Sequence, residues 1–199
     1  MLKALLSSVI AGLASCGFAA GLRAQGPPAH AVAREYNTSL GVECGHCHTG
    51  SDFADASKPA FDFARRMERM VRGINDGPLR ELGGVTCWSC HRGHAIPPRL
   101  PRADWEPIAT SHAADFAGGR DGLALAMGVY SASLGVDCSH CHMPGNWTDA
   151  SKPAHQTVKL MMTIFNLIPG YFDPAVRTPV TQCYMCHQGH IKVERTLPS

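Results

Sequence analysis

Cys44-Gly45-His46-Cys47-His48 is the stretch that decides the fold: two cysteines stand two residues apart and a histidine follows at once. The same Cys-x-x-Cys-His pattern returns at Cys87–His91, Cys138–His142 and Cys183–His187. The 199-residue chain holds 9 cysteines and 11 histidines. At these frequencies chance gives roughly 0.02 copies of the pattern in the whole chain. Four copies therefore indicate one chemistry used four times.

This pattern is typical of covalent haem attachment. The two thiols form thioethers with the haem, and the histidine after them binds the iron as the proximal ligand. Zinc sites and disulfides also use paired cysteines, but neither needs a histidine directly after the second one. The sequence thus predicts four covalently bound haem c groups. The predicted attachment sites are Cys44, Cys47, Cys87, Cys90, Cys138, Cys141, Cys183 and Cys186, and the predicted proximal ligands are His48, His91, His142 and His187.

The chain repeats itself with a period of 94 residues. EYNTSLGVECGHCH at 35–48 returns as VYSASLGVDCSHCH at 129–142, and DASKPA at 55–60 returns unchanged at 149–154. The copies then slip by two residues, so that CWSCHRGH at 87–94 matches CYMCHQGH at 183–190. Each copy holds two haem motifs, which predicts two dihaem modules, 25–103 and 104–199. They join near Ala103, in the proline-rich stretch 95–107, which has no helical or strand period.

Helices are the regular structure that the sequence favours. KPAFDFARRMERMVRGIN at 58–75 has an amphipathic pattern, with Pro59 in its first turn and the stop signal Asn75-Asp76-Gly77-Pro78 at its end. A shorter helix fits the segment before the first motif of each module, and strand signals are weak throughout. We therefore expect a mainly α fold: a multihaem c-type cytochrome with two pseudo-symmetric dihaem modules and long loops.

The sixth iron ligands are sought among methionines, because methionine raises the haem potential and histidine gives a lower one. Met127 lies eleven residues before Cys138, and Met67 recurs at the 94-residue offset as Met161. We predict that these three methionines bind iron, although a methionine on an amphipathic helix is often plain core. The repeat places Ala33 opposite Met127, so the first haem needs another ligand. His30, one helical turn earlier, is our prediction; His112 or an open iron are the alternatives.

The N-terminus resembles an export signal. One early Lys3 precedes an apolar stretch from Ala4 to Ala14, which is too short to span a bilayer, so residues 1–24 are predicted to be a signal peptide. Cys16 follows Leu13-Ala14-Ser15, the small-residue pattern of bacterial lipoprotein processing. Lipidation there predicts a periplasmic or outer-surface protein tethered to a membrane, and cleavage after Ala20 or Ala24 is the alternative. A net charge of +2 without a basic stripe makes nucleic acid an unexpected partner.

ARRMERMVRGIN followed by GVTCWSCHRG, and SLGVDCSHCH preceded by Met127, resemble the helix, turn and haem-motif units of the tetrahaem cytochrome subunit of purple-bacterial photosynthetic reaction centres. Shorter related cytochromes occur in non-phototrophs. The resemblance covers about residues 30–190 and implies a mainly α fold with pseudo-twofold symmetry, haems in a row, and ligands at Met67 and Met127. Three departures stand out. That subunit is far longer, its fourth haem takes a histidine where residues 75–86 hold none, and Ala33 stands where a methionine is expected.

The function we expect is electron transport between periplasmic or membrane redox proteins, with a reaction centre as one candidate partner, and no enzyme activity. A haem enzyme that reduces a small oxidant at an open first haem is one alternative, and a protomer of a haem filament is another. His46, His94, His140 and His190 are expected at the surface or beside the haems, and ligation of a neighbouring iron is the alternative. The face with Arg65, Arg66 and Arg69 is either plain solvated surface, an acidic-partner contact or a propionate contact.

Overall fold

A computed structural model describes residues 29–112, 114, 121–172 and 183–199. These residues are mainly helical and contain no strand beyond the isolated bridges Thr49–Asp52 and Met143–Asn146, which agrees with the expected fold class. The elements are α1 (Ala29–Leu40), η1 (Cys44–His46), α2 (Pro59–Asp76), α3 (Cys87–His91), α4 (Arg102–Ser111), α5 (Asp121–Leu134), η3 (Cys138–His140), α6 (Pro153–Leu167), η4 (Ile168–Tyr171) and α7 (Tyr184–His187).

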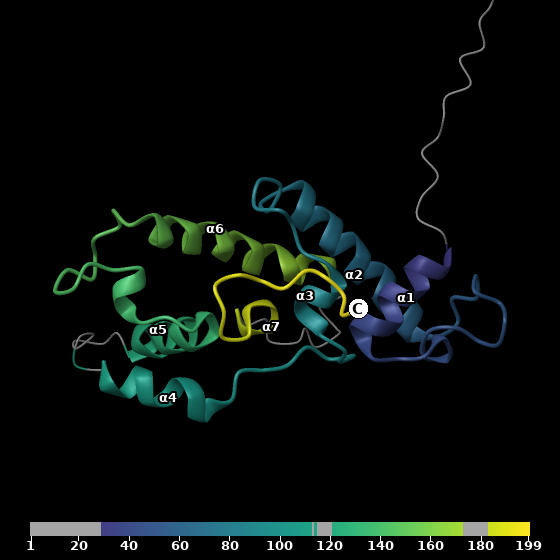
Figure 1. Cartoon of the computed structure of the whole chain (residues 1–199), viewed down its shortest axis with the longest axis horizontal. Helices are drawn as coiled ribbons and strands as arrows, with labels where there is room; N and C mark the ends of the chain where they lie inside the picture. The colour runs from purple at the N-terminus through teal and green to yellow at the C-terminus, as the bar shows by residue number, and fades with distance from the viewer. Residues whose placement is uncertain (1–28, 113, 115–120, 173–182) are drawn as a thin grey trace, which may run out of the picture.

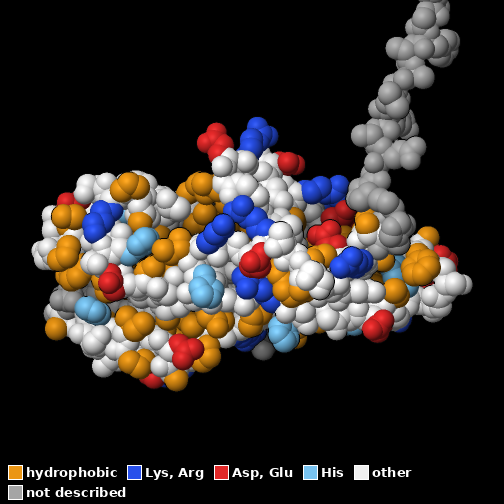
Figure 2. All heavy atoms as spheres, in the orientation of Figure 1, with side chains coloured by type: hydrophobic (Ala, Val, Ile, Leu, Met, Phe, Trp, Pro, Cys, Tyr) orange, Lys and Arg blue, Asp and Glu red, His pale blue; other side chains and the backbone are white. Residues whose placement is uncertain are grey.

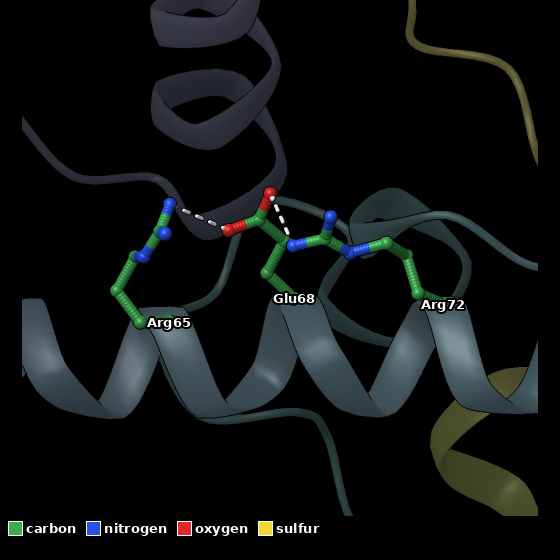
Figure 3. A network of polar contacts seen from close by, with 3 residues as sticks. All are labelled: Arg65, Glu68 and Arg72. Carbon is green, nitrogen blue, oxygen red and sulfur yellow. Dashed lines mark hydrogen bonds and ion pairs between the residues drawn. The ribbon is translucent and has the colours of Figure 1, made fainter.

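The predicted amphipathic helix is confirmed as α2. Pro59 occupies its first turn, where the missing N–H of proline costs nothing, and the helix ends at Asp76 with Gly77 as its C-cap. Along its outer face Glu68 accepts from Arg65 at 3.0 Å and pairs with Arg72 at 3.2 Å (Figure 3). Arg66 pairs with Asp62 at 2.8 Å. Arg65 and Arg66 are therefore already paired within their own helix.

The two long helices differ in the surface that they expose. Where α2 carries arginines, its repeat counterpart α6 exposes Leu160, Met162 and Leu167. In Figure 2, Lys and Arg side chains gather over the middle of the face that is drawn, and hydrophobic side chains spread over the left part, where α5 and α6 lie in Figure 1. The two modules thus share a backbone pattern but expose different types of side chain.

A close backbone contact joins the ends of α1 and α3. The N–H of Gly93 donates to the carbonyl of Ser39 at 2.8 Å, and a Cβ on Gly41 would lie 2.0 Å from the carbonyl oxygen of Gly93. The second module repeats this contact: Gly189 donates to Ser133 at 2.9 Å, and a Cβ on Gly135 would meet the Gly189 oxygen at 2.1 Å. This contact, which we call the glycine latch, sets each module's first haem motif against its second.

The two modules meet through their second motifs. Helices α3 and α7 contact each other in the middle of the elongated molecule, with α1 and α2 on one side and α5 and α6 on the other (Figure 1). The loops after α1 and α5, which carry the first and third motifs, lie toward opposite ends. We therefore call the motifs of α3 and α7 the inner motifs and those of η1 and η3 the outer motifs.

Further contacts bind the modules across the same junction. The ring of Phe63 on α2 lies 5.2 Å from that of Phe172, measured between centroids. Gly73 leaves room for Tyr171, since a Cβ on Gly73 would lie 1.9 Å from the tyrosine oxygen. Near the C-terminus, the guanidinium of Arg195 donates to the carbonyl of Leu82 at 2.6 Å. Two sequence repeats thus form one packed body.

The proline-rich stretch holds a helix that the sequence reasoning missed. Residues 95–107 show no period, yet Pro101 is the N-cap of α4, which runs to Ser111 with Pro107 inside it. Helix α4 is held by packing on α5, because Gly128 brings the two backbones together: a Cβ there would lie 2.8 Å from that of Ala109. The expectation of an irregular linker was wrong for residues 102–107. None of the described helices is long and apolar enough to cross a membrane.

Candidate haem sites

The inner motifs share an unusual turn after their histidine. Arg92 and Gln188 have left-handed backbones, with φ of 49° and 48°, and the glycines that follow have φ of 83° and 82°. Glycine adopts this conformation without strain, whereas a side chain makes it costly. The double turn bends each chain back toward the histidine that ends its helix.

This turn orients the two inner histidines. The Nδ1 atom of His91 lies 2.8 Å from the carbonyl of His94, and that of His187 lies 2.9 Å from the carbonyl of His190. Because a carbonyl only accepts, each Nδ1 carries the proton, which leaves Nε2 as the free lone pair that a metal needs. Burial lowers the pKa of His91, which favours the neutral imidazole. His94 and His190 therefore act here through their backbone, while their side chains are exposed.

The outer histidines lie among rings instead. The ring of His48 contacts Phe53 and Phe61 at 5.1 and 5.5 Å between centroids. The equivalent His142 contacts Trp147 at 6.0 Å and His155 at 5.3 Å. In both, the buried Nδ1 has no hydrogen-bond partner among the residues that the structure describes. The histidines of the inner and outer motifs thus differ in the environment of Nδ1.

A cavity of about 730 Å³ connects three of the four motifs. This volume lies within the roughly 300–1,000 Å³ typical of cofactor sites. Its walls bring together the predicted ligands of both modules. Among the residues that line it are Cys47, Cys87, Cys90, Cys183 and Cys186, His91 and His187, and the methionines Met67, Met70, Met161 and Met185.

A second cavity, of about 140 Å³, belongs to the third motif. It is lined by Cys138, Cys141 and His142 from the motif and by Met127 from α5. His112 lines the same cavity, and its ring lies 6.4 Å from that of Trp147. The suggestion that His112 reaches across to the first haem was therefore wrong, because α4 packs on α5 and places His112 at the third motif.

The first motif reaches the larger cavity through His46 and Cys47, while its His48 lines neither cavity. Ala33 is exposed on α1. His30 lies in the first turn of α1, but its side chain, like Cys16 and the rest of the predicted signal peptide, falls outside the described residues.

Two of the predicted attachment cysteines are joined to each other. Cys90 and Cys186 form a disulfide with an S–S distance of 2.10 Å and a Cα–Cα distance of 4.1 Å. The other six motif cysteines are free thiols. Burial raises the pKa of the Cys87 and Cys183 thiols to about 11. A sulfur in a disulfide cannot carry haem, so the disulfide and haem attachment at Cys90 and Cys186 are alternative states.

The residues present fit a covalently held haem. Imidazole nitrogens and methionine sulfurs are established axial ligands of haem iron, and both types line the larger cavity around paired thiols. The inner histidines are held in the tautomer that leaves Nε2 available. The buried Nε1 of Trp88 and Nε of Arg92 also have no partner within the described residues, and both are donors that suit an anionic group such as a propionate.

A family model described as the photosynthetic reaction centre cytochrome C subunit matches residues 37–137, which is 101 of the 199 residues. The chain belongs to this family. The match to the reaction-centre cytochrome family begins in α1, includes the first two haem motifs and both Met67 and Met127, and ends just before Cys138. The resemblance seen in the helix and motif units is thereby confirmed.

One relative is the photosynthetic reaction center cytochrome c subunit of Rubrivivax gelatinosus. It is 24% identical to this chain over 218 residues, which cover 75% of this chain and 58% of the relative. The chain thus spans little more than half the length of that subunit.

Two site residues were missed by the sequence reasoning. Tyr36 lines the larger cavity and interacts electrostatically with Cys87, and its repeat partner Tyr130 lines the smaller cavity and interacts with Cys183. Each tyrosine therefore lies on the helix before an outer motif and reaches toward the inner motif of its module. The recurrence of Tyr in EYNTSLG and VYSASLG was the available signal.

Proposed function

We propose that this chain is a tetrahaem c-type cytochrome that carries electrons between redox partners at the periplasmic or outer surface of a bacterium. The observation that carries the proposal is the cavity of about 730 Å³, which brings the cysteines and histidines of both inner motifs to one space beside Met67 and Met161. Four copies of the attachment motif and membership of the reaction-centre cytochrome family support the same reading. Each haem, when bound, supplies one-electron exchange at its iron.

The arrangement of the motifs suits electron transfer along the molecule. The inner motifs contact each other through α3 and α7, and the glycine latches set each outer motif against its inner neighbour. The order in space is therefore first, second, fourth, third. Such an order supports a continuous path from one end of the elongated fold to the other.

The ligand assignment follows the site geometry. The eight motif cysteines attach the haems, and His48, His91, His142 and His187 are the proximal ligands. We assign Met67 and Met161 to the second and fourth haems, because both line the larger cavity with His91 and His187, and Met127 to the third haem, because it lines the smaller cavity with His142. His30 remains the proposed sixth ligand of the first haem.

The partners we propose are redox proteins: a soluble carrier on one side and a membrane complex on the other, with a photosynthetic reaction centre as the candidate that the family name suggests. Lipidated Cys16 would hold the chain at the membrane, because two acyl chains suffice for stable anchoring. A Cys16→Ser variant should then leave the membrane fraction.

The test is to produce the chain in cells with c-type haem maturation and to measure its mass and its potentiometric titration. We expect a mass increase of four haems and four one-electron transitions, three of them with methionine-ligated signatures. Fewer than four haems on the purified chain would refute the tetrahaem assignment.

One observation favours a second candidate, a haem enzyme that reduces a small oxidant. Ala33 has no atom that binds iron, so the first haem depends on a ligand from elsewhere. Carbon monoxide binding to the reduced protein separates the candidates, since a fully six-coordinate carrier binds almost none. Loss of one low-spin signal in His30→Ala, with no carbon monoxide binding by the unaltered chain, supports the carrier.

A further inference from the structure

The hexapeptide Asp-Ala-Ser-Lys-Pro-Ala, identical at 55–60 and 149–154, builds the same local structure twice. The Asp55 carboxylate accepts from the backbone N–H of Ser57 at 2.8 Å, and Asp149 accepts from Ser151 at 2.7 Å. The proline begins the following helix, α2 or α6, and the lysine before it is the N-cap residue. Neither haem attachment nor iron ligation explains why this segment is conserved between the two copies.

The lysine of each hexapeptide reaches back to an outer haem motif. The Nζ of Lys58 donates to the carbonyl of Gly45, which lies between Cys44 and Cys47. The Nζ of Lys152 donates in the same way to Ser139, between Cys138 and Cys141. Both lysines are half-buried. The tight turn between the two attachment cysteines is thus tied to an ammonium group in each module.

The charge of each ammonium group also acts on an attachment thiol of the same motif. Lys58 interacts electrostatically with the thiol of Cys47, and Lys152 with that of Cys141. A haem attached through these cysteines would therefore have a positive charge near its attachment turn. The ferrous state carries one positive charge less than the ferric state, so a nearby cation favours the ferrous state. The half-exposed position means that solvent reduces the effect without removing it.

We propose that Lys58 and Lys152 are positioning residues of the two outer haems, which fix the attachment turn and raise the reduction potential of the haem beside them. This inference rests on the proposed tetrahaem function. Asp149, which interacts with Lys152, offsets part of the charge in the second module. The potential is therefore set by the hexapeptide as a unit, with the lysine as its positive member.

The test compares the potentiometric titrations of Lys58→Gln, Lys58→Arg and the unaltered chain, with the haem content of each measured by mass. Glutamine keeps a donor but loses the charge, whereas arginine keeps both. We expect four haems throughout, a lower potential for one haem only in Lys58→Gln, and a potential close to the original in Lys58→Arg. Lys152→Gln should lower the potential of the other outer haem and leave the first unchanged. Arg99→Gln, which removes an exposed charge elsewhere, should shift neither.

The outcomes separate this inference from the function on which it rests. Four haems with unchanged potentials in both glutamine variants would overturn the role of the lysines while the tetrahaem function stands. Fewer than four haems on the unaltered chain would overturn the function itself. If Lys58→Gln loses a haem that Lys58→Arg keeps, the cation is needed to hold the attachment turn, and the positioning role is supported.

Discussion

At the scale of single residues, Tyr36 shows how the wall of the larger cavity changes the acidity of a side chain. Burial raises its pKa from 10.0 to about 12, and the Glu68 carboxylate adds to the effect. The folded chain therefore holds the phenol proton more tightly than the unfolded chain does. The stability that follows is complete below pH 10 and is lost as the pH rises toward 12.

We accordingly expect Tyr36 to remain protonated at pH 11. Carbon-13 NMR of the tyrosine Cζ in the reduced, diamagnetic protein measures this directly, with Tyr36→Phe to identify the resonance. The same variant should lose stability less steeply above pH 10, because phenylalanine has no proton to lose. A Tyr36 midpoint at the ordinary value would contradict the burial that the structure shows.

Met67 and Met70 provide a matched test of iron ligation. Both lie on α2 and line the larger cavity, but only Met67 has a methionine, Met161, at its repeat position; Ile164 corresponds to Met70. Met67→Leu should abolish one thioether-to-iron absorption band, lower one haem potential and open one iron to carbon monoxide. Met70→Leu should change none of these. Equal spectra for the two variants would mean that Met67 is plain core.

Residue types with fixed spacing could be predicted from sequence, and residues placed by packing could not. Each of the four motifs spans five consecutive residues, so its cysteines and histidine could be identified without knowledge of the fold. The position of His112 depends on how α4 packs on α5, which no spacing in the sequence encodes. The positions of the His94 and His190 carbonyls depend on two left-handed residues in succession. Arginine and glutamine, the residue types at 92 and 188, do not indicate this conformation from sequence.

At the scale of elements, the glycine latch is the contact most sensitive to substitution. Gly41 and Gly50 share a φ of 63°, but only Gly41 faces another backbone, that of Gly93. Gly50→Ala should cost about 1–2 kcal/mol from the left-handed conformation alone. Gly41→Ala should cost about 1–3 kcal/mol more, because the rigid carbonyl must move.

Thermal unfolding of the two haem-loaded variants measures this difference. Gly41→Ala should also disturb electron exchange between the first and second haems, since the latch sets one motif against the other. If both variants unfold at the same temperature, the close approach of Gly41 to Gly93 is not a feature of the protein in solution.

Helix α2 could be predicted because its start, period and stop all lie within its own residues. Helix α4 could not, because three prolines precede it closely in sequence and its stabilising partner, Gly128, lies about two turns into a later helix. Local sequence signals therefore sufficed to predict α2, which carries the proposed ligand Met67. They failed for α4, which is held by its tertiary contact with α5.

At the scale of the whole molecule, the chemical state of Cys90 and Cys186 shows whether haem has been attached to the chain. The haem-free, oxidised chain should yield a cross-linked peptide pair containing these two cysteines, whose Cα atoms lie 4.1 Å apart. The haem-loaded chain should yield none, because each sulfur has only one partner. Mass spectrometry of non-reduced digests decides between these states.

The matching control is thiol alkylation under denaturing conditions. All eight motif cysteines should react in the reduced, haem-free chain and none in the haem-loaded chain. A haem-loaded chain that kept the cross-link would show that Cys90 and Cys186 carry no thioether, and the attachment sites would have to be revised.

The pairing of Cys90 with Cys186 has a consequence for the origin of the fold. These cysteines are repeat equivalents, so each meets its own counterpart, as residues on the axis of a symmetric dimer do. A single ancestral module would have met a second copy of itself through the same helix. The chain thus has, within one polypeptide, the symmetry of a homodimer, and its two halves differ in surface: α2 exposes arginines, whereas α6 exposes Leu160, Met162 and Leu167.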